Sequence, residues 1–217
     1  ALVPDYTPGC RRILIANDWY PTLLRPNVEV VTDGVAEITE HAVRTQDGRE
    51  FPVDTIIFGT GFRTTEFLSP LHITGRDGVD LADAWTDGAR AYLGMAVPQF
   101  PNLFMLYGPN TNLGHNSILF MIEQQVAYIR TLLVQMMRDD AAVAEVSPAA
   151  MDRYDAEIEA LAERTVWAED CHSWYKTESG RITNNWPDYT VRYRRRLRHP
   201  VPGDVRLTPR AALTTGR

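Results

Sequence analysis

The chain has 217 residues, of which 44% are hydrophobic, and a net charge of −6 from 22 Lys and Arg against 28 Asp and Glu. This composition supplies a proper core, and no stretch is apolar for long enough to form a transmembrane span. The length fits one large domain, or one domain with an appendage.

The N-terminal residues carry neither a basic segment nor an apolar run, so no signal peptide is visible. Cys10 and Cys171 lie far apart without metal-ligand spacing, and we predict that both are reduced packing residues of a cytoplasmic protein. Position 1 is not Met, so we expect the chain to start at a processed, engineered or truncated end.

The charge is distributed unevenly along the chain. Residues 1–180 carry a net charge of −13, whereas residues 181–217 carry +7, centred on the arginines of residues 192–198. We interpret the basic tail as solvated or docked against the acidic body. Contact with nucleic acid through these arginines is the alternative, and we predict no nucleic-acid partner.

The first 60 residues contain several strand signals. Residues 1–26 are irregular and rich in proline, and residues 28–31 are predicted to form a short strand. Residues 35–39 and 42–45 alternate loosely, and Asp47-Gly48 is a strong turn signal. Together they predict a small antiparallel excursion that leads into the next strand.

Residues 53–58 read Val-Asp-Thr-Ile-Ile-Phe, which is typical of a central parallel strand buried on both faces. Gly59-Thr60-Gly61 follows, and glycines after such a strand favour a turn where the backbone closely approaches a ligand. Residues 103–107 predict a second buried strand, which stops at Gly108-Pro109-Asn110.

Two helices follow. Asn116 or Ser117 caps the longer one, and apolar residues recur at helical spacing in a stripe that we predict to face the core: Ile118, Ile122, Val126, Ile129, Leu133 and Met136. The second helix begins at Ser147-Pro148, and its stripe consists of Met151, Tyr154, Ile158 and Leu161. After Thr165 the chain is predicted to be irregular and aromatic.

These elements predict an α/β fold with few parallel strands, a small antiparallel excursion and long helices. The chain lacks the Gly-x-Gly-x-x-Gly turn of a dinucleotide-binding fold and is too short for both of its βαβ halves. Strands that end in ligand-type turns without a phosphate loop indicate the second half of a nucleotide-binding domain.

Several segments resemble, in the same order, the motifs of flavin-dependent monooxygenases. Gly59-Thr60-Gly61-Phe62 is similar to the family's Ala-Thr-Gly-Phe/Tyr segment, and Gly9-Cys10-Arg11-Arg12 is similar to its Gly-x-Lys-Arg segment. The likeness extends over nearly residues 1–198 through residues 17–20, 25–28, 75–78, 92–94, 100–104, 108–110 and 173–175. Residues 112–117, Asn-Leu-Gly-His-Asn-Ser, resemble a subgroup of the Baeyer–Villiger monooxygenases.

The resemblance implies the C-terminal half of a Rossmann-like FAD-binding domain. It assigns residues 1–146 to the FAD/NAD(P)-binding domain, and residues 147–217 to a helix plus an irregular, aromatic and basic C-terminal extension that packs on it. It also implies FAD and NADPH as cofactors, with a small ketone and O2 as reactants. One oxygen would be inserted next to the ketone carbonyl through a C4a-peroxyflavin, giving an ester or a lactone.

The glycine motifs that hold FAD and NADPH in the family are not found in these residues. We therefore expect a truncated piece that is inactive alone, and a homo-oligomer is left open. Two alternatives also remain open: an N- or S-oxygenating flavin monooxygenase, and a non-catalytic fragment that folds but binds little.

The resemblance implies roles for single residues. Arg12 matches the catalytic arginine, whose permanent charge stabilises an anionic adduct. Arg11 matches the basic residue that contacts the 2′-phosphate of NADPH, where the family usually has Lys. Trp174 matches a tryptophan that packs against NADP and hydrogen-bonds it. The other cofactor-binding candidates are Gly59, Thr60, Gly61, Gly108, Pro109, Asn110, Asn116 and Ile118, and no metal site is predicted.

Each candidate also has a structural interpretation. Arg11 and Arg12 are alternatively surface charges, and Trp174 is alternatively a core residue. Asn116 and Ile118 lie at the start of a helix, and we expect the free N–H groups there to point at the flavin and to favour its anionic reduced ring. His115, beside the same helix cap, is interpreted as structural.

Overall fold

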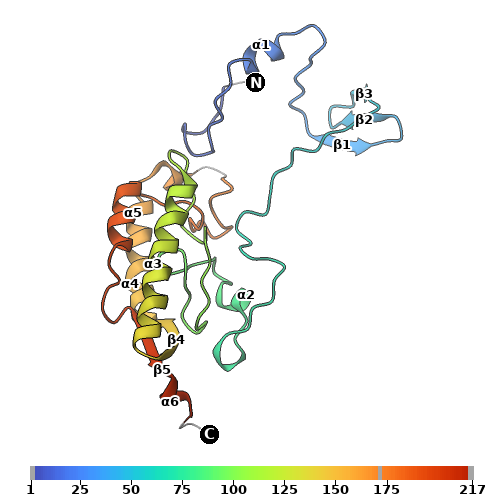
Figure 1. The fold of residues 1–217 in the computed structure, drawn as a ribbon. Helices are drawn as coiled ribbons and strands as arrows, with labels where there is room; N and C mark the ends of the chain where they lie inside the picture. Colours follow the sequence, from blue (N-terminus) through green and yellow to red (C-terminus); the bar gives the residue numbers. More distant parts are fainter. Residues whose placement is uncertain (1–2, 171–172, 215–217) are drawn as a thin grey trace. The chain divides into compact units, whose positions relative to one another are not determined.

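The computed structural model describes residues 3–170 and 173–214. Its contacts divide the chain into two compact units. The first unit consists of Ile13–Phe62 and the described residues before Tyr6; the second consists of Tyr6–Arg12 and the described residues from Arg63 onward. Figure 1 labels the elements, which are α1 (Trp19–Leu23), β1 (Val35–Ile38), β2 (Ala42–Thr45), β3 (Glu50–Pro52), the 3-10 turn η1 (Arg76–Gly78), α2 (Leu81–Ala84), α3 (Ile118–Arg138), β4 (Ala141–Val146), α4 (Pro148–Ala162), η2 (Val166–Ala168), α5 (Thr190–Leu197), β5 (Val205–Pro209) and α6 (Arg210–Thr214).

The first unit contains the predicted antiparallel excursion. Strands β1, β2 and β3 form one antiparallel sheet in chain order, and the Asp47-Gly48 turn joins β2 to β3. Hydrogen bonds from Thr45 and Arg49 hold the Asp47 carboxylate in this turn and lower its pKa to about 2. The prediction of a short strand at residues 28–31 is wrong, because these residues form no ladder in the described structure.

The prediction of two buried parallel strands is also wrong for the residues described. The ladder ends at Val53, whose N–H donates to the carbonyl of His41 (3.1 Å), and Ile57 is 91% exposed. Residues 103–107 likewise form no strand, and both sheets of the described structure are antiparallel. A central strand exists only where neighbours pair with both of its edges, and no described strand forms a ladder with residues 53–58 or 103–107.

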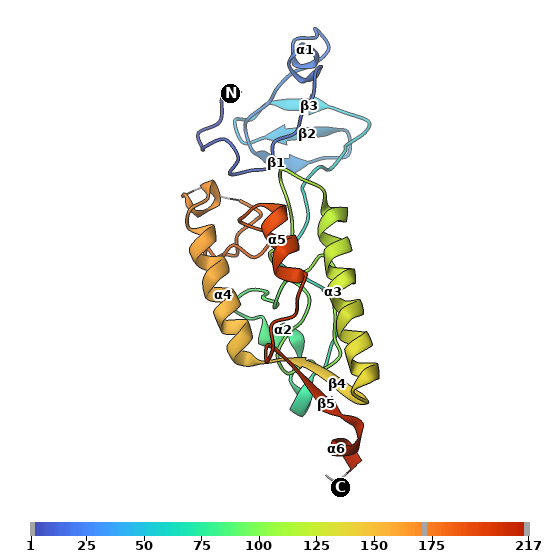
Figure 2. The same ribbon diagram turned by 60° about the vertical axis from the view of Figure 1, so that its left-hand side comes forward.

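In the second unit, α3, α4 and α5 lie side by side, and the antiparallel pair of β4 and β5 crosses one end (Figures 1 and 2). The helix starts follow the predicted caps: the Ser117 hydroxyl accepts the N–H of Phe120, and the Ser147 hydroxyl accepts that of Ala150. These capping bonds satisfy N–H groups that the first helical turn leaves free. Pro148 occupies the first position of α4, as predicted.

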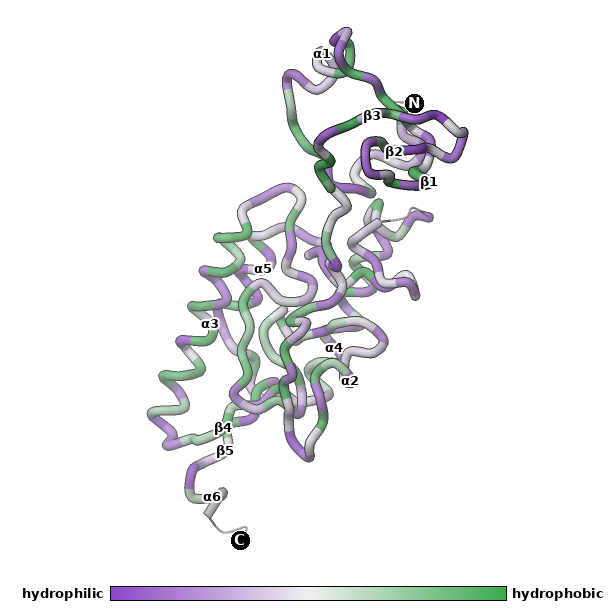
Figure 3. Tube along the Cα trace, turned by 90° about the vertical axis from the view of Figure 1, so that its right-hand side faces the viewer, coloured by the Kyte–Doolittle hydropathy of each residue, from purple (hydrophilic) through white to green (hydrophobic). Residues whose placement is uncertain are grey.

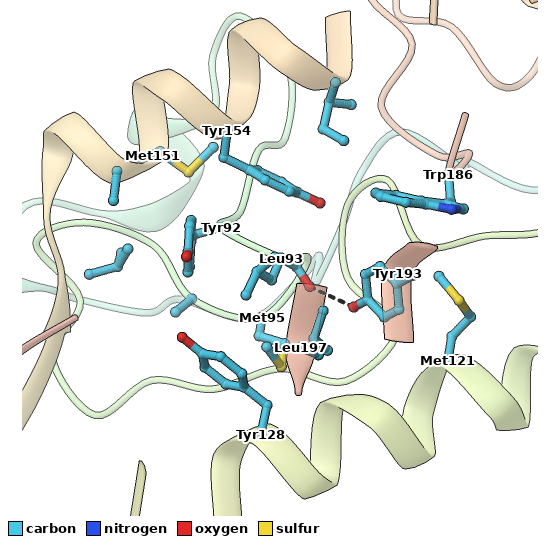
Figure 4. Close-up of a cluster of buried hydrophobic side chains, with 14 of the residues drawn as sticks. Tyr92, Leu93, Met95, Met121, Tyr128, Met151, Tyr154, Trp186, Tyr193 and Leu197 are labelled. Atoms are coloured by element: carbon cyan, nitrogen blue, oxygen red, sulfur yellow. Dashed lines mark hydrogen bonds between the residues drawn. The ribbon is translucent and has the colours of Figure 1, made fainter. Parts of the chain in front are cut away.

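The core of this unit lies between the helices and an irregular segment around residue 93 (Figure 4). Met121 and Tyr128 of α3, Tyr154 of α4 and Tyr193 of α5 are all buried in it. The hydroxyl of Tyr193 donates to the carbonyl of Leu93 (2.7 Å), which ties α5 to the irregular segment. The core therefore fixes the loops that carry several of the candidate residues.

The predicted core-facing stripe of α3 is only partly right: Ile118 and Ile129 pack against the core, but other members of the stripe do not lie in the buried row. The buried row of α3 consists of Met121, Gln125, Tyr128 and Leu132, whereas Val126 and Leu133 are about half exposed. Hydrophobic residues recur along much of the helix, so more than one side looks apolar (Figure 3). The polar Gln125 is tolerated in the buried row because its amide bonds with the backbone of Tyr107, Leu93 and Gly94.

The basic C-terminal region is more regular than predicted, because it contains α5 and β5. Tyr193 and Leu197 of α5 are buried, and Arg196 forms an ion pair with Glu157 of α4. This contact agrees with a basic tail docked on the acidic body.

Elements on both sides of residue 146 share one core, and the division of the chain at that residue stays a prediction. Within the described residues, no helix has the length and apolar character needed to cross a membrane.

Candidate functional site

Residues 6–12 are held by the irregular segment that follows α4. The indole N–H of Trp167 donates to the carbonyl of Gly9 (3.2 Å), and the hydroxyl of Ser173 donates to the carbonyl of Cys10 (2.9 Å). The same hydroxyl accepts the backbone N–H of Tyr175 (3.3 Å). The arginines that follow Cys10 are thereby brought to the segment that carries Trp174.

Cys10 is fully buried at this contact and is disulfide-bonded, so the prediction of a reduced thiol is wrong for Cys10. Spacing along a sequence does not show which cysteines meet in the fold. Cys171 lies outside the described residues.

The two arginine side chains are exposed. The guanidinium of Arg11 lies 4.4 Å from the ring centroid of Tyr6. Burial raises the pKa of the Tyr107 and Tyr175 phenols, and the positive charge of Arg12 opposes this rise. Arg12 forms no ion pair with any carboxylate of the described residues.

Trp174 is 40% exposed, and its ring packs on Tyr175 with the centroids 4.7 Å apart. Its backbone carbonyl accepts hydrogen bonds from Thr64 (2.5 Å) and Asn184 (3.2 Å). Among the described residues, no acceptor is bonded to its indole N–H. The tryptophan is thus fixed by its backbone and keeps an exposed edge and a donor for a ligand.

The turn at residues 108–110 is close-packed. A Cβ added to Gly108 would lie 2.5 Å from the carbonyl oxygen of Gly94, so glycine is required here by packing within the protein. Asn110 is buried, and its φ is +56°. Its backbone N–H donates to the carbonyl of Thr183 (2.8 Å), and its side-chain Nδ2 donates to the carbonyl of Ile182 (2.8 Å). Pro109 is buried between them.

The start of α3 carries two further candidates. Asn116 is exposed, and its amide nitrogen donates to the hydroxyl of Thr190 at the start of α5 (3.0 Å). Ile118 is half-buried and packs against the core. Because Ser117 caps the N–H of Phe120, the free N–H groups of this helix are fewer than the sequence suggests.

Gly59, Thr60 and Gly61 belong to the first unit, and all three are exposed. Gly61 has φ +89°, which favours glycine, but an added Cβ at Gly59 or Gly61 would meet nothing within 4 Å. The close backbone approach predicted for these glycines is not made to the residues described. Their cofactor role stays a prediction.

Sequence reasoning missed a polar network that joins Tyr107, Asn112 and Asn185. The hydroxyl of Tyr107 donates to Asn112 Oδ1 (2.8 Å), and Asn112 Nδ2 donates to Asn185 Oδ1 (2.7 Å). Backbone bonds between residues 110–112 and 183–186 align the two asparagines. The cluster of polar residues around Asn112 was the available signal, but only the fold brings Asn185 to it. The described residues contain no cluster of His, Cys, Asp and Glu able to hold a metal ion.

Comparison with known proteins connects this arrangement to a family. A Baeyer–Villiger monooxygenase of Pseudomonas aeruginosa is 42% identical over 98% of this chain and 41% of its own length. This chain belongs to the Baeyer–Villiger monooxygenase family. An FAD-binding monooxygenase of Aspergillus niger is also 42% identical, over 90% of this chain and 33% of its own length.

A solved structure supports the same relation at the level of the fold. The crystal structure of OTEMO in complex with FAD and NADP matches 94% of this chain and 39% of its own, with a TM-score of 0.83 and 28% identity. The α/β fold with small sheets and long helices is therefore that of Baeyer–Villiger monooxygenases. The chain spans less than half the length of these relatives, and no family model matches it.

Proposed function

We propose that this chain is the part of an NADPH- and FAD-dependent Baeyer–Villiger monooxygenase that supplies the catalytic arginine and one side of the cofactor site. The observation that carries the proposal is that Arg12, free of carboxylate partners in the described structure, is brought to the segment of Trp174. A guanidinium without a counterion is suited to stabilise an anionic adduct next to a ketone carbonyl.

The residues present fit the two cofactors to different degrees. The exposed Arg11 and the indole N–H of Trp174 are suited to a phosphate and to the sugar–nicotinamide edge of NADPH. At Gly108–Asn110, the side chain of Asn110 is already bonded to the protein, so this turn would contact FAD through its backbone. The bound flavin would supply the activation of O2, and Arg12 would hold the developing negative charge beside it.

The Rossmann-like half domain and the inactivity of the chain alone belong to the same proposal. The exposure of Ile57 and Phe58 agrees with a strand whose partners are supplied by further polypeptide. The 217-residue chain should then purify without flavin absorbance. Stoichiometric yellow cofactor in the isolated chain would contradict this part of the proposal.

The function is tested in a chimera of the Pseudomonas aeruginosa relative in which the aligned segment is replaced by residues 1–217. The identity of 42% across 98% of the chain makes this exchange feasible. We expect stoichiometric FAD, NADPH oxidation and conversion of a panel of ketones to esters or lactones. A flavin-loaded chimera that oxygenates amines or sulfides but none of the ketones would instead support an N- or S-oxygenating monooxygenase.

A further inference from the structure

Residues 173–186 form a loop whose two sides lie next to each other. The backbone N–H of Thr183 on the second side donates to the carbonyl of Tyr175 on the first (3.2 Å). Trp174, the candidate NADP contact, comes directly before Tyr175, and Asn184 comes directly after Thr183. The loop therefore brings Asn184 next to the backbone of the tryptophan.

The backbone of Asn184 is bonded to the segment that contains the turn at residues 108–110. The N–H of Asn110 donates to the carbonyl of Thr183 (2.8 Å), and the N–H of Asn112 donates to the carbonyl of Asn184 (2.9 Å). Both bonds belong to the main chain, so they remain when the side chain of Asn184 is changed. They tie Asn184 to the turn that would contact FAD in the proposed function.

The side chain of Asn184 forms a separate bond, to Trp174. Its Nδ2 donates to the backbone carbonyl of Trp174 (3.2 Å), and the direction of this bond is certain because a carbonyl oxygen can only accept. The hydroxyl of Thr64 donates to the same oxygen (2.5 Å). The two bonds use both lone pairs of this oxygen, so the carbonyl serves to anchor the tryptophan and leaves contact with a ligand to the indole.

Asn184 and Trp174 differ in their exposure to solvent. Asn184 is buried, and a hydrogen bond from a buried donor is stronger than one that competes with water. Trp174 is 40% exposed, and its ring packs on Tyr175 with the centroids 4.7 Å apart. The tryptophan is therefore anchored through its backbone, while its ring keeps an exposed edge.

We propose that Asn184 is a positioning residue: together with Thr64 it holds Trp174 in place relative to the turn at residues 108–110, so that the indole is oriented before NADPH binds. The inference rests on the proposed function of Trp174 and of this turn. A ligand that meets an ordered side chain does not have to supply the free energy of ordering it, so the anchored indole raises the affinity for NADPH.

The first test uses NMR of the 217-residue chain and needs no cofactor. The order parameter of the Trp174 backbone N–H is measured in the wild type, in Asn184→Ala and in Thr64→Val. We expect it to fall from about 0.85 to below about 0.6 in each variant, because one of the two anchoring bonds is lost. Trp85, which is buried elsewhere in the same unit, is the internal reference and should keep its value.

An unchanged order parameter of Trp174 in Asn184→Ala would overturn the inference. Should Asn184→Ala fail to fold, Thr64→Val decides in its place, because it removes the other donor to the same carbonyl oxygen and leaves the buried asparagine intact.

The second test measures the affinity of the FAD-loaded chimera for NADP+. Asn184→Ala should raise the Kd about fivefold, the order of magnitude that one net hydrogen bond contributes, with an unchanged FAD content. In a Trp174→Ala background the same change should add almost nothing, because the affinity is lost through the indole. The matched control is Asn102→Ala, which removes two side-chain bonds to the backbone of β4 and should leave the Kd unchanged.

The double variant separates positioning from other roles. Additive losses in Asn184→Ala and Trp174→Ala would overturn the inference, because Asn184 would then act on NADP+ without the tryptophan. An unchanged Kd in Asn184→Ala would contradict it as well. If Trp174→Ala alone leaves the Kd unchanged, the proposed function of Trp174 fails and the role toward NADPH fails with it, whereas the NMR measurement still decides whether Asn184 anchors Trp174.

Discussion

At the scale of single residues, Arg12 is the most specific prediction. Arg12→Ala in the chimera should lower ketone oxygenation about a hundredfold or more, because one preorganised charge at a developing anion is removed. NADPH oxidation should persist, with hydrogen peroxide as its product. Product analysis beside an NADPH assay measures both, and Arg63→Ala, at an exposed arginine paired with Glu66, is the matched control. Normal ester yield in Arg12→Ala would remove Arg12 from the mechanism.

Gly108 gives a prediction about packing. Gly108→Ala should lower the free energy of unfolding by about 1–3 kcal/mol, because the new methyl group meets the carbonyl of Gly94 and the side chain of Met105. Gly114→Ala is the control, since a Cβ there meets nothing within 4 Å. Urea unfolding measures the free energy of unfolding of both variants. Equal stability would mean that the turn relaxes easily and that its glycine serves a ligand instead.

At the scale of elements, the antiparallel pair of β4 and β5 contains a buried carboxylate, that of Glu145 in β4. Burial alone would raise the pKa of Glu145. Hydrogen bonds from Arg76 (2.8 Å), Arg206 (3.3 Å) and the N–H of Gln99 (3.2 Å) together lower it by more than burial raises it, so the pKa in the folded state lies below the ordinary value. This stabilisation is present above the unfolded-state pKa of about 4.3 and is lost as pH falls through the folded pKa.

Glu145→Gln should therefore cost about 1–3 kcal/mol of unfolding free energy near neutral pH and much less in acid, where the wild type loses the same interactions. Urea unfolding at about pH 7 and about pH 3 measures the difference. Glu123→Gln, at an exposed position of α3, should behave as the wild type does at both pH values. A cost for Glu145→Gln that does not change with pH would show that the charge on Glu145 is not the stabilising factor.

Local signals in the sequence predicted elements well, and signals that depend on distant partners did not. Ser117 and Ser147 cap their helices through the next turn, so both starts were readable from the sequence. The segment at residues 53–58 looked like a central strand, but strand pairing depends on other segments. The buried face of α3 was predicted only in part, because the row that includes Gln125 is buried through bonds to loop carbonyls, which hydrophobic periodicity does not locate.

In the candidate site too, local motifs were recognised in the sequence, whereas contacts between distant segments were not. Motif order predicts roles for Arg12 and Trp174, which stay predictions, and the hydrogen bond from Ser173 to Cys10 brings their segments together. Tyr107 and Asn185 were not predicted, because their importance comes from a network between segments more than 70 residues apart. The sequence predicted that Gly108 binds a cofactor, although its packing against Gly94 already requires glycine at this position.

At the scale of the whole molecule, the exposed apolar surface leads to the last prediction. Leu119, Val126 and Leu133 repeat every seven residues along α3 and are 70%, 49% and 47% exposed. Apolar side chains exposed along one side of a helix favour association in water. The isolated chain should therefore self-associate with increasing concentration, and the double variant Leu119→Lys, Leu133→Lys should shift it toward the monomer without loss of stability.

Sedimentation velocity over a range of concentrations measures this association, and urea unfolding measures the stability. Leu132→Ala is the matched contrast: its side chain is buried in the core one position from Leu133, so it should cost about 2–5 kcal/mol and leave association through the exposed stripe unchanged. A wild-type chain that remains monomeric at every concentration would show that this stripe does not drive association. Strong destabilisation by the lysines would show instead that these side chains pack in the chain's own core.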